Sequence, residues 1–246
     1  MENDIPVVLT DAHVGLFHEQ GFLSLGRITT DAEVAWLREA YQAIVKRRTG
    51  FLPWAVNDAR AQQAHKALVT LTMPEHTLPE LKDTLYARNA RKVVARLFDI
   101  AETDVIVGWR LFTKPAHGGE TTWHQDVAYR PHQQHQGATV WMPLDPVTVE
   151  NGCLLFIAGS HRGAVHPHTV HQGQLRAEHI DPASAVACPL APGEATVHHC
   201  GTLHAAGPNH TDAPRRAFSI VFQVTGSGHR NQVGFADAAA GIRGKP

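Results

Sequence analysis

Residues 215–224 read Arg-Arg-Ala-Phe-Ser-Ile-Val-Phe-Gln-Val, and the two sets of alternate side chains in this stretch differ in character. Successive side chains of a strand point to opposite faces, so the stretch predicts a strand with two unlike faces. The apolar face carries Phe218, Ile220, Phe222 and Val224. The polar face carries Arg215, Ser219 and Gln223. Because a buried guanidinium without a partner is costly, we expect the apolar face to pack on a second layer and the polar face to line a wet or ligand-filled cavity.

The sequence before this stretch contains further short candidate strands, separated by Gly, Pro and Asn. We place them at residues 104–113, 136–144, 153–158 and 194–199. Such spacing is typical of an antiparallel sandwich or barrel. The same alternation puts Thr139 and Trp141 on one face of their strand, and Arg110 on the face that Gly108 shares. A barrel with a polar lumen is a natural container for a small molecule.

Residues 10–99 read mostly as helix. A first helix is expected over residues 11–20, ended by Gly21 and followed by a strand over residues 22–25. No linker or internal repeat follows. We therefore expect one domain over residues 1–246, mainly β, with N-terminal helices packed on the β core.

Two longer helices in this half are expected to begin with a capping box. Thr30 and Glu33 have the spacing of this motif, and Thr77 and Glu80 repeat it, with Pro79 near the helix start. Apolar residues then recur at helical spacing. They are Val34, Leu37, Tyr41 and Ile44 in one helix, and Ala90, Val93, Val94, Leu97 and Phe98 in the other.

Composition narrows the class of protein. The 246 residues include 22 Lys plus Arg and 23 Asp plus Glu, so no basic surplus is available to bind nucleic acid or an anionic membrane. The N-terminus lacks the apolar segment of a leader, and no apolar run approaches the length of a membrane span. The three cysteines share no CxxC spacing, which favours free thiols in a reducing compartment. We expect a soluble cytoplasmic protein.

Histidine is over-represented, with 18 residues, and 13 of them lie between His117 and His210, which raises the odds of a metal site. In Trp123-His124-Gln125-Asp126, an extended strand would point His124 and Asp126 to the same side. His204 is a third candidate ligand, far downstream. Two histidines and one carboxylate on one face of an octahedral ion leave three positions open, as in non-haem iron(II) oxygenases.

Arg215 strengthens this interpretation, because a guanidinium can hold a carboxylate through two parallel hydrogen bonds. Ser219, on the same face, could add a hydrogen bond to that carboxylate. The pair suits a cosubstrate that chelates iron at one end and presents a carboxylate at the other, and 2-oxoglutarate has that shape. Arg216 points to the opposite face, and we expect it to be a surface charge.

Taken together, the motifs resemble those of the phytanoyl-CoA dioxygenase family, and the resemblance covers nearly the whole chain. Besides the two opening stretches Leu9-Thr10 and Phe17-His18-Glu19-Gln20-Gly21-Phe22, the segments that carry it are Trp123-His124-Gln125-Asp126, Trp141-Met142-Pro143-Leu144-Asp145, Glu150-Asn151-Gly152-Cys153-Leu154, Gly159-Ser160-His161, His204-Ala205-Ala206-Gly207-Pro208-Asn209 and Arg215.

The resemblance implies a double-stranded β-helix, a jelly roll of the cupin type, that uses Fe(II), 2-oxoglutarate and dioxygen. It implies that the iron ligands, and so the catalytic residues, are His124, Asp126 and His204. The residues expected at the cosubstrate are Arg215, Ser219, Trp141 and Arg110. This chain has Ala206 where the family often has Ser, so one hydrogen bond to the cosubstrate is either missing or supplied elsewhere, by Ser219 or Thr139.

We expect hydroxylation of a small organic metabolite, with release of succinate and carbon dioxide. Desaturation, epimerisation or cyclisation would use the same site, and a non-catalytic cupin-like binding protein or a metal-dependent hydrolase are further alternatives. Substrate identity and oligomeric state stay open.

Other motif residues and histidines receive less specific expectations. The segment Gly159-Ser160-His161 is expected to be a structural turn, and at least one of His198 and His199 should face away from the site. The remaining group is expected to lie in loops, and its members are His166, His168, His171, Trp54, His65 and Lys66.

Overall fold

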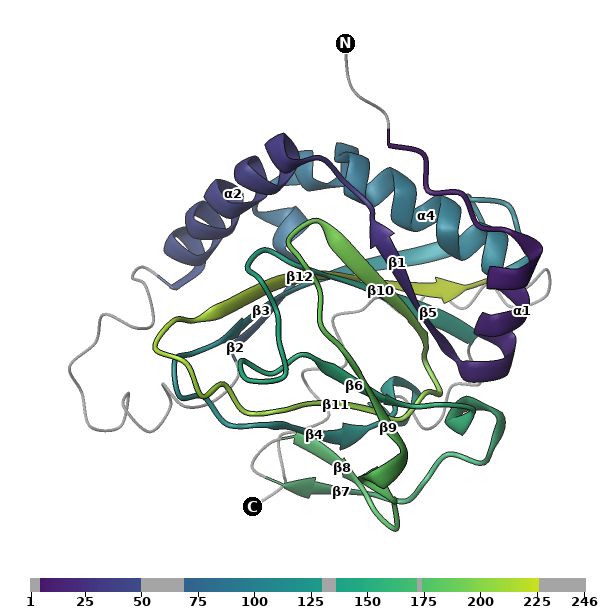
Figure 1. Ribbon diagram of the computed structural model, residues 1–246. Coiled ribbons are helices and arrows are strands. Elements are labelled where there is room, and N and C mark those ends of the chain that lie inside the picture. Colours follow the sequence, from purple (N-terminus) through teal and green to yellow (C-terminus); the bar gives the residue numbers. More distant parts are fainter. Residues whose placement is uncertain (1–4, 50–68, 130–135, 172–173, 226–246) are drawn as a thin grey trace, which may run out of the picture.

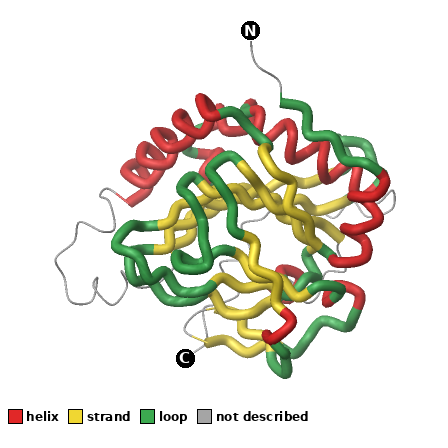
Figure 2. Tube along the Cα trace, in the orientation of Figure 1, coloured by secondary structure: helices red, strands yellow, loops and turns green. Residues whose placement is uncertain are grey.

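The computed structural model describes residues 5–49, 69–129, 136–171 and 174–225. Two antiparallel sheets face each other, and the helices lie along the outer side of the larger sheet (Figure 1). Figure 2 shows the same layers, with the long helices gathered on one side of the strands. The mainly β fold with N-terminal helices is therefore confirmed, with a jelly-roll core. Trp54, His65 and Lys66 lie outside the described residues.

The larger sheet has six strands in the order β1-β10-β5-β12-β3-β2. Their bounds are β1 Phe22–Arg27, β10 Glu194–His199, β5 Gln136–Pro143, β12 Arg215–Val224, β3 Val105–Lys114 and β2 Val69–Thr72. Strand β12 is central and pairs without interruption with β3 on one side and with β5 on the other. This continuous pairing determines which side chains are neighbours on the inner face of the sheet, the face that looks toward the smaller sheet. We call the interior between the two sheets the lumen.

The smaller sheet has four strands in the order β4-β11-β6-β9, and a separate hairpin, β7–β8, lies beside β4. Their bounds are β4 Thr121–His124, β11 His204–Ala206, β6 Leu154–Ile157, β9 Ala185–Cys188, β7 His168–His171 and β8 Gln174–Ala177. Sequence reasoning placed a strand at β6 and an extended stretch at β4. It did not find β2, β7, β8, β9 or β11, which have three or four residues each.

The first helix, α1 (Asp11–Gln20), has the predicted bounds. Thr10 caps its N-terminus, and Gly21 ends it at φ +84°. A Cβ at Gly21 would lie 2.4 Å from the His161 ring and 2.5 Å from Thr202 Oγ1. Glycine is therefore required here both for its backbone conformation and for the close approach of the turn before His204.

Helix α2 (Asp31–Thr49) begins where expected, since Thr30 Oγ1 accepts a hydrogen bond from the Glu33 amide at 3.1 Å. The capping box is only half formed, however. The Glu33 carboxylate accepts hydrogen bonds from the amides of Leu85 and Tyr86, at 2.6 and 2.9 Å. Those residues open helix α4 (Leu85–Phe98), so Glu33 caps the N-terminus of a neighbouring helix.

The predicted helix start at Thr77–Glu80 is wrong. Two short 3₁₀ helices, Pro74–His76 and Pro79–Asp83, occupy this region, and α4 begins at Leu85. Thr84 caps α4 by accepting a hydrogen bond from the Ala87 amide at 3.2 Å. The helix register beyond that point is as expected, with Ala90, Val93, Val94 and Leu97 buried.

Two apolar clusters stabilise the fold. The larger lies between the helices and the outer face of the six-stranded sheet, where Phe218, Ile220 and Phe222 of β12 join Leu37 and Tyr41 of α2. The smaller lies between the two sheets and includes Phe22, Trp141, Leu154 and Phe156. The predicted division of β12 into an outer apolar face and an inner polar face is confirmed. In the described part of the chain, no helix is long and apolar enough to cross a membrane.

Candidate active site

His124, Asp126 and His204 come together between the two sheets. Each contributes one potential ligand atom, and the three atoms lie within 4.8 Å of one another. His124 ends β4 and His204 begins β11, and the two are directly paired across these strands. Asp126 does not continue β4 as predicted but starts a short 3₁₀ helix, Asp126–Tyr129. The turn still brings Asp126 Oδ1 to 3.8 Å from His124 Nε2 and 3.7 Å from His204 Nε2.

Both imidazoles are oriented by the backbone. Nδ1 of His124 donates to the Thr122 carbonyl at 2.8 Å, and Nδ1 of His204 donates to the Thr202 carbonyl at 2.9 Å. A carbonyl only accepts, so the proton of each neutral ring sits on Nδ1 and the lone pair on Nε2 faces Asp126. This arrangement is the usual way in which a protein fixes the tautomer of a metal-binding histidine.

The electrostatics of the three residues also favour metal binding. Burial lowers the pKa of His124 and the pKa of His204 to about 4, so both rings are neutral near pH 7. Burial would raise the pKa of Asp126, but the imidazoles of His204, His198 and His124 together hold it well below its usual range. Separations of 3.7–3.8 Å are too long for hydrogen bonds, so the three donor atoms converge without satisfying one another. The donor set fits iron(II).

Arg215, Ser219 and Trp141 lie together on adjacent strands of the six-stranded sheet. Ser219 is paired with Trp141, and the guanidinium carbon of Arg215 lies 5.2 Å from the centroid of the Trp141 ring. Arg215 is 2% exposed, and its Nε has no hydrogen-bond partner among the described residues. The Ser219 hydroxyl is also buried without a partner. Buried donors that lack acceptors fit a carboxylate ligand.

Arg110 lies on β3 directly opposite Ser219, which is paired on its other side with Trp141. Its Nη1 is buried and has no partner in the described part of the chain. The structure therefore places all four predicted cosubstrate residues on the inner wall of the lumen.

Lys114 was missed by sequence reasoning, because the predicted strand ended one residue before it. It is fully buried beside Arg215, with which it is paired across β3 and β12. Its ammonium donates to the carbonyls of Gly119, Ala206 and Gly207 at 3.0, 3.3 and 2.5 Å. Burial and the charge of Arg215 lower the pKa of Lys114 to about 7. Its donors are used in holding the segment that follows His204, whereas Arg215 keeps an unsatisfied donor.

The two hydroxyls proposed to replace a serine at position 206 have different partners. Thr139 Oγ1 donates to Asp126 Oδ2 at 2.8 Å, so it is already engaged. Ser219 Oγ is not engaged with any described residue. Of the two, only Ser219 is available to a cosubstrate.

Gln125, between the two proximal ligands, connects three segments. Its Nε2 donates to the Gly201 carbonyl at 2.7 Å, and its Oε1 accepts from the His166 amide at 2.8 Å. Its own amide donates to Nε2 of His168 at 3.2 Å. The expectation that His166, His168 and His171 all lie in a loop is therefore wrong in part, because His168 and His171 belong to β7 and His168 supports the ligand loop.

The two adjacent histidines of β10 point to opposite sides, as predicted. His199 stacks on Phe98, with ring centroids 6.0 Å apart, on the helix side of the sheet. His198 faces the lumen, where Nε2 lies 3.5 Å from Asp126 Oδ2. Strand parity required that one of them face inward, but the sequence did not indicate which metal ligand it would approach.

The turn at Gly159-Ser160-His161 has the structural role expected. Ser160 Oγ donates to the Ile157 carbonyl at 2.7 Å and accepts from the Leu203 amide at 2.8 Å. It thereby supports the residue that precedes His204.

Arg216 faces away from the lumen, as strand parity predicted, but it is not simply a surface charge. It is partly buried and donates to both oxygens of Asp145, at 2.9 and 2.6 Å. The expectation of a surface charge is therefore wrong, because Arg216 forms an ion pair that joins β12 to the segment just after β5.

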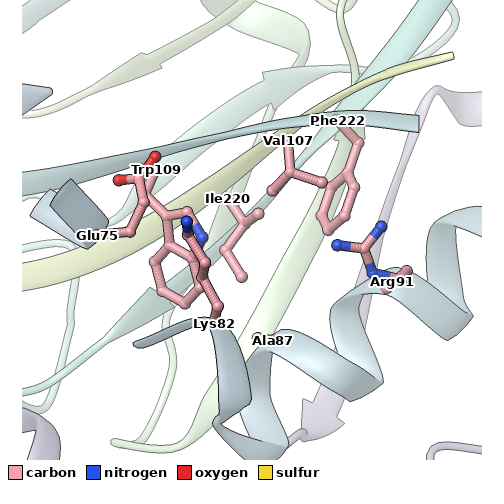
Figure 3. A pocket seen from close by; sticks show the side chains of 8 residues that line it. All are labelled: Glu75, Lys82, Ala87, Arg91, Val107, Trp109, Ile220 and Phe222. Carbon is pink, nitrogen blue, oxygen red and sulfur yellow. The ribbon is translucent and has the colours of Figure 1, made fainter. Parts of the chain in front are cut away.

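A separate pocket of about 200 Å³ lies on the helix side of the six-stranded sheet. Figure 3 shows Ile220 and Phe222 of β12 along it, with Glu75 near Trp109 and with Lys82 and Arg91 at its side. Because Ile220 and Phe222 belong to the outer face of β12, this pocket is on the opposite side of the sheet from Arg215 and Ser219.

Comparison with known proteins decides the family. The model of the family described as phytanoyl-CoA dioxygenase (PhyH) matches residues 17–217. The chain belongs to the phytanoyl-CoA dioxygenase family. The predicted resemblance is thereby confirmed, and with it the enzyme class, a non-haem dioxygenase dependent on iron(II) and 2-oxoglutarate.

Individual proteins that resemble this chain differ in how much of it they match. The solved structure of EvdO2 from Micromonospora carbonacea var. aurantiaca, in complex with 2-oxoglutarate, is 35% identical with a TM-score of 0.81, covering 93% of this chain and 96% of EvdO2. A probable alpha-ketoglutarate-dependent hypophosphite dioxygenase of Stutzerimonas stutzeri is 36% identical over 44% of this chain, which is 41% of that protein's length. A methylphosphonate hydroxylase of Gimesia maris is 24% identical, covering 93% of this chain and 86% of the relative.

Proposed function

We propose that this protein hydroxylates a small organic metabolite and that it converts 2-oxoglutarate to succinate and carbon dioxide in the same turnover. The observation that carries the proposal is the juxtaposition of two features in one lumen. One is the group of three possible metal-ligand atoms from His124, Asp126 and His204. The other is the buried guanidinium of Arg215, whose Nε has no hydrogen-bond acceptor among the described residues.

In this proposal, His124, Asp126 and His204 hold iron(II). Bound iron, with 2-oxoglutarate and dioxygen, supplies the oxidation of a substrate C–H bond. The three side chains would hold the ion by one atom each, and the cosubstrate and dioxygen would take positions that they do not fill. Neutral, pre-oriented imidazoles bind the metal without first losing a proton.

The cosubstrate would extend from the metal along β12. Arg215 would bind its distal carboxylate through two hydrogen bonds, and Ser219 would add a third. Trp141 holds the guanidinium by its aromatic face, which restricts the directions in which Arg215 can reach. Arg110, facing the same lumen, would contact the cosubstrate from the β3 side.

A small substrate is consistent with the names of two relatives, a hypophosphite dioxygenase and a methylphosphonate hydroxylase. Hydroxylation is the outcome we favour, while desaturation, epimerisation and cyclisation would need only a different placement of the substrate at the same residues. A non-catalytic cupin-like binding protein is less well supported, because all three ligands and Arg215 are present and oriented.

Anaerobic titration of the metal-free protein with Fe(II) and then with 2-oxoglutarate tests the proposal. We expect a weak visible charge-transfer band on addition of 2-oxoglutarate, and succinate release that is stimulated by the correct member of a set of candidate substrates. Succinate release together with a product one oxygen atom heavier would support hydroxylation. Iron binding without any band would contradict the proposed role of the cosubstrate site.

A further inference from the structure

His198 is the most deeply buried polar ring of the described lumen wall, with 2% of its surface exposed. Its ring centroid lies 4.3 Å from that of His204 and 5.2 Å from that of Phe156. Neither of its ring nitrogens makes a hydrogen bond to a described residue. A buried imidazole without hydrogen-bond partners destabilises a fold, so a polar ring at this position indicates a role beyond packing.

The ring of His198 points toward the carboxylate of Asp126. Nε2 of His198 lies 3.5 Å from Oδ2, the oxygen that already accepts a hydrogen bond from Thr139. The other oxygen, Oδ1, faces His124 and His204. The carboxylate thus has two distinct sides, with the metal ligands at Oδ1 and with Thr139 and His198 at Oδ2.

His198 also differs from the two ligand histidines in its tautomer. In His124 and His204, a backbone carbonyl accepts the Nδ1 proton and leaves the Nε2 lone pair for the metal. No carbonyl engages Nδ1 of His198, so its proton can reside on Nε2. In that form His198 is a hydrogen-bond donor toward Asp126 and not a fourth ligand.

We propose that His198 is a positioning residue, which donates a hydrogen bond from Nε2 to Asp126 Oδ2 and so holds Oδ1 toward the iron. This inference rests on the proposed function, because it takes His124, Asp126 and His204 as the ligands. The separation of 3.5 Å is longer than a normal hydrogen bond, and contacts of this kind typically tighten when a site is filled. Removing outer partners of metal ligands typically weakens metal binding by about 10–100-fold.

Three variants separate hydrogen bonding from packing. In His198→Gln the amide nitrogen can take the place of Nε2, in His198→Asn it reaches only the place of Nδ1, and His198→Leu keeps volume without a donor. The readout is the dissociation constant for Fe(II), measured anaerobically by competition with a chelator, together with the melting temperature of the metal-free protein.

We expect His198→Leu and His198→Asn to weaken Fe(II) binding by about tenfold or more, and His198→Gln to stay within about threefold of the wild type. The melting temperature of the metal-free His198→Leu variant should be equal or higher, because an unsatisfied polar group is gone. If His198→Leu does not fold, the comparison of Gln with Asn is sufficient to decide.

Two results would overturn the inference, and they are distinguishable from failure of the proposed function. Wild-type affinity in His198→Leu would show that the ring does not hold Asp126, as would equal losses in the Gln and Asn variants. In either case Asp126→Ala should still lose iron, which would leave the proposed ligand set intact. A wild-type protein that binds no Fe(II) would overturn the ligand set and this inference together.

Discussion

The guanidinium of Arg215 lies over the ring of Trp141, 5.2 Å from the ring centroid, and no described carboxylate forms an ion pair with it. Burial lowers the pKa of Arg215 to about 10, which still leaves it charged near neutral pH. An aromatic face restrains a cation without neutralising it. The charge is therefore held in position while its hydrogen-bonding capacity stays open to a ligand.

We predict that Arg215→Ala raises the KM for 2-oxoglutarate far more than it alters iron binding. A charge-assisted two-point contact contributes about 1.5–3 kcal/mol, which corresponds to roughly ten- to hundredfold in affinity. Steady-state kinetics with varied 2-oxoglutarate, beside an anaerobic Fe(II) titration, measures the two effects separately.

Arg216→Ala is the matched control for this prediction, since the two arginines are adjacent and point to opposite faces. It removes the ion pair with Asp145 and should lower the melting temperature while leaving the KM for 2-oxoglutarate nearly unchanged. Equal effects of the two substitutions on KM would contradict the division of β12 into two faces.

His124→Ala and His204→Ala should each abolish turnover while the fold survives. Each removes one of three ligands, but the larger apolar cluster lies on the other side of the sheet and does not depend on the metal. Bound iron measured after gel filtration should be strongly reduced, with an unchanged far-UV circular dichroism spectrum. Near-normal activity with bound iron in either variant would show that the ligand set is wrong.

Lys114→Met should destabilise the protein, because the carbonyls of Gly119, Ala206 and Gly207 lose their common donor. Loss of buried hydrogen bonds of this kind typically costs about 1–3 kcal/mol. For a chain of this size, each kcal/mol lowers the melting temperature by about 2–4 °C. Lys92→Met, at an exposed position of α4, is the control and should have little effect. A Lys114→Met variant as stable as the control would contradict the anchoring role.

Glu75→Gln should stabilise the protein in a pH-dependent way. Burial raises the pKa of Glu75 in the folded state, and its Oε2 has no partner among the described residues. The folded protein is therefore more stable when the Glu75 carboxyl is protonated. The stability that Glu75 contributes is complete below its unfolded pKa and is lost as the pH rises through the folded value, by about 1.4 kcal/mol for each unit of pKa elevation.

Urea denaturation at pH 4 and pH 8 measures this effect. The advantage of Glu75→Gln over the wild type should be large at pH 8 and small at pH 4. Glu80→Gln, at an exposed position of the following 3₁₀ helix, should show no such change. An advantage that is independent of pH would contradict the assignment of the effect to the buried charge.

Much of the fold could be predicted because its signals are local. Helix α1 has the predicted bounds and ends at Gly21 as expected, and the two faces of β12 follow from alternation over ten residues. Strands β7, β8, β9 and β11 contain three or four residues each, which is too short for a periodic pattern to stand out.

The site was predicted less completely, because several of its contacts depend on long-range pairing. Asp126 was placed near His124 by assuming a strand, whereas a 3₁₀ turn achieves the approach. The position of His198 beside Asp126 depends on the pairing of His198 with Thr139 across β10 and β5, which nothing near His198 in the sequence specifies. Residues that act through a neighbour become visible only when the strand order is known.

The carboxylate of Glu33 connects α2 to α4, and amide hydrogen exchange can measure how stable this connection is. The amides of Leu85 and Tyr86 lie 52 and 53 residues from Glu33 and are bonded to it, although they belong to another helix. First-turn amides of a helix normally exchange quickly with solvent because they have no partner within the helix. Here their protection requires α2 to be docked, so the exchange rates of two amides in α4 report on how often the other helix leaves the sheet.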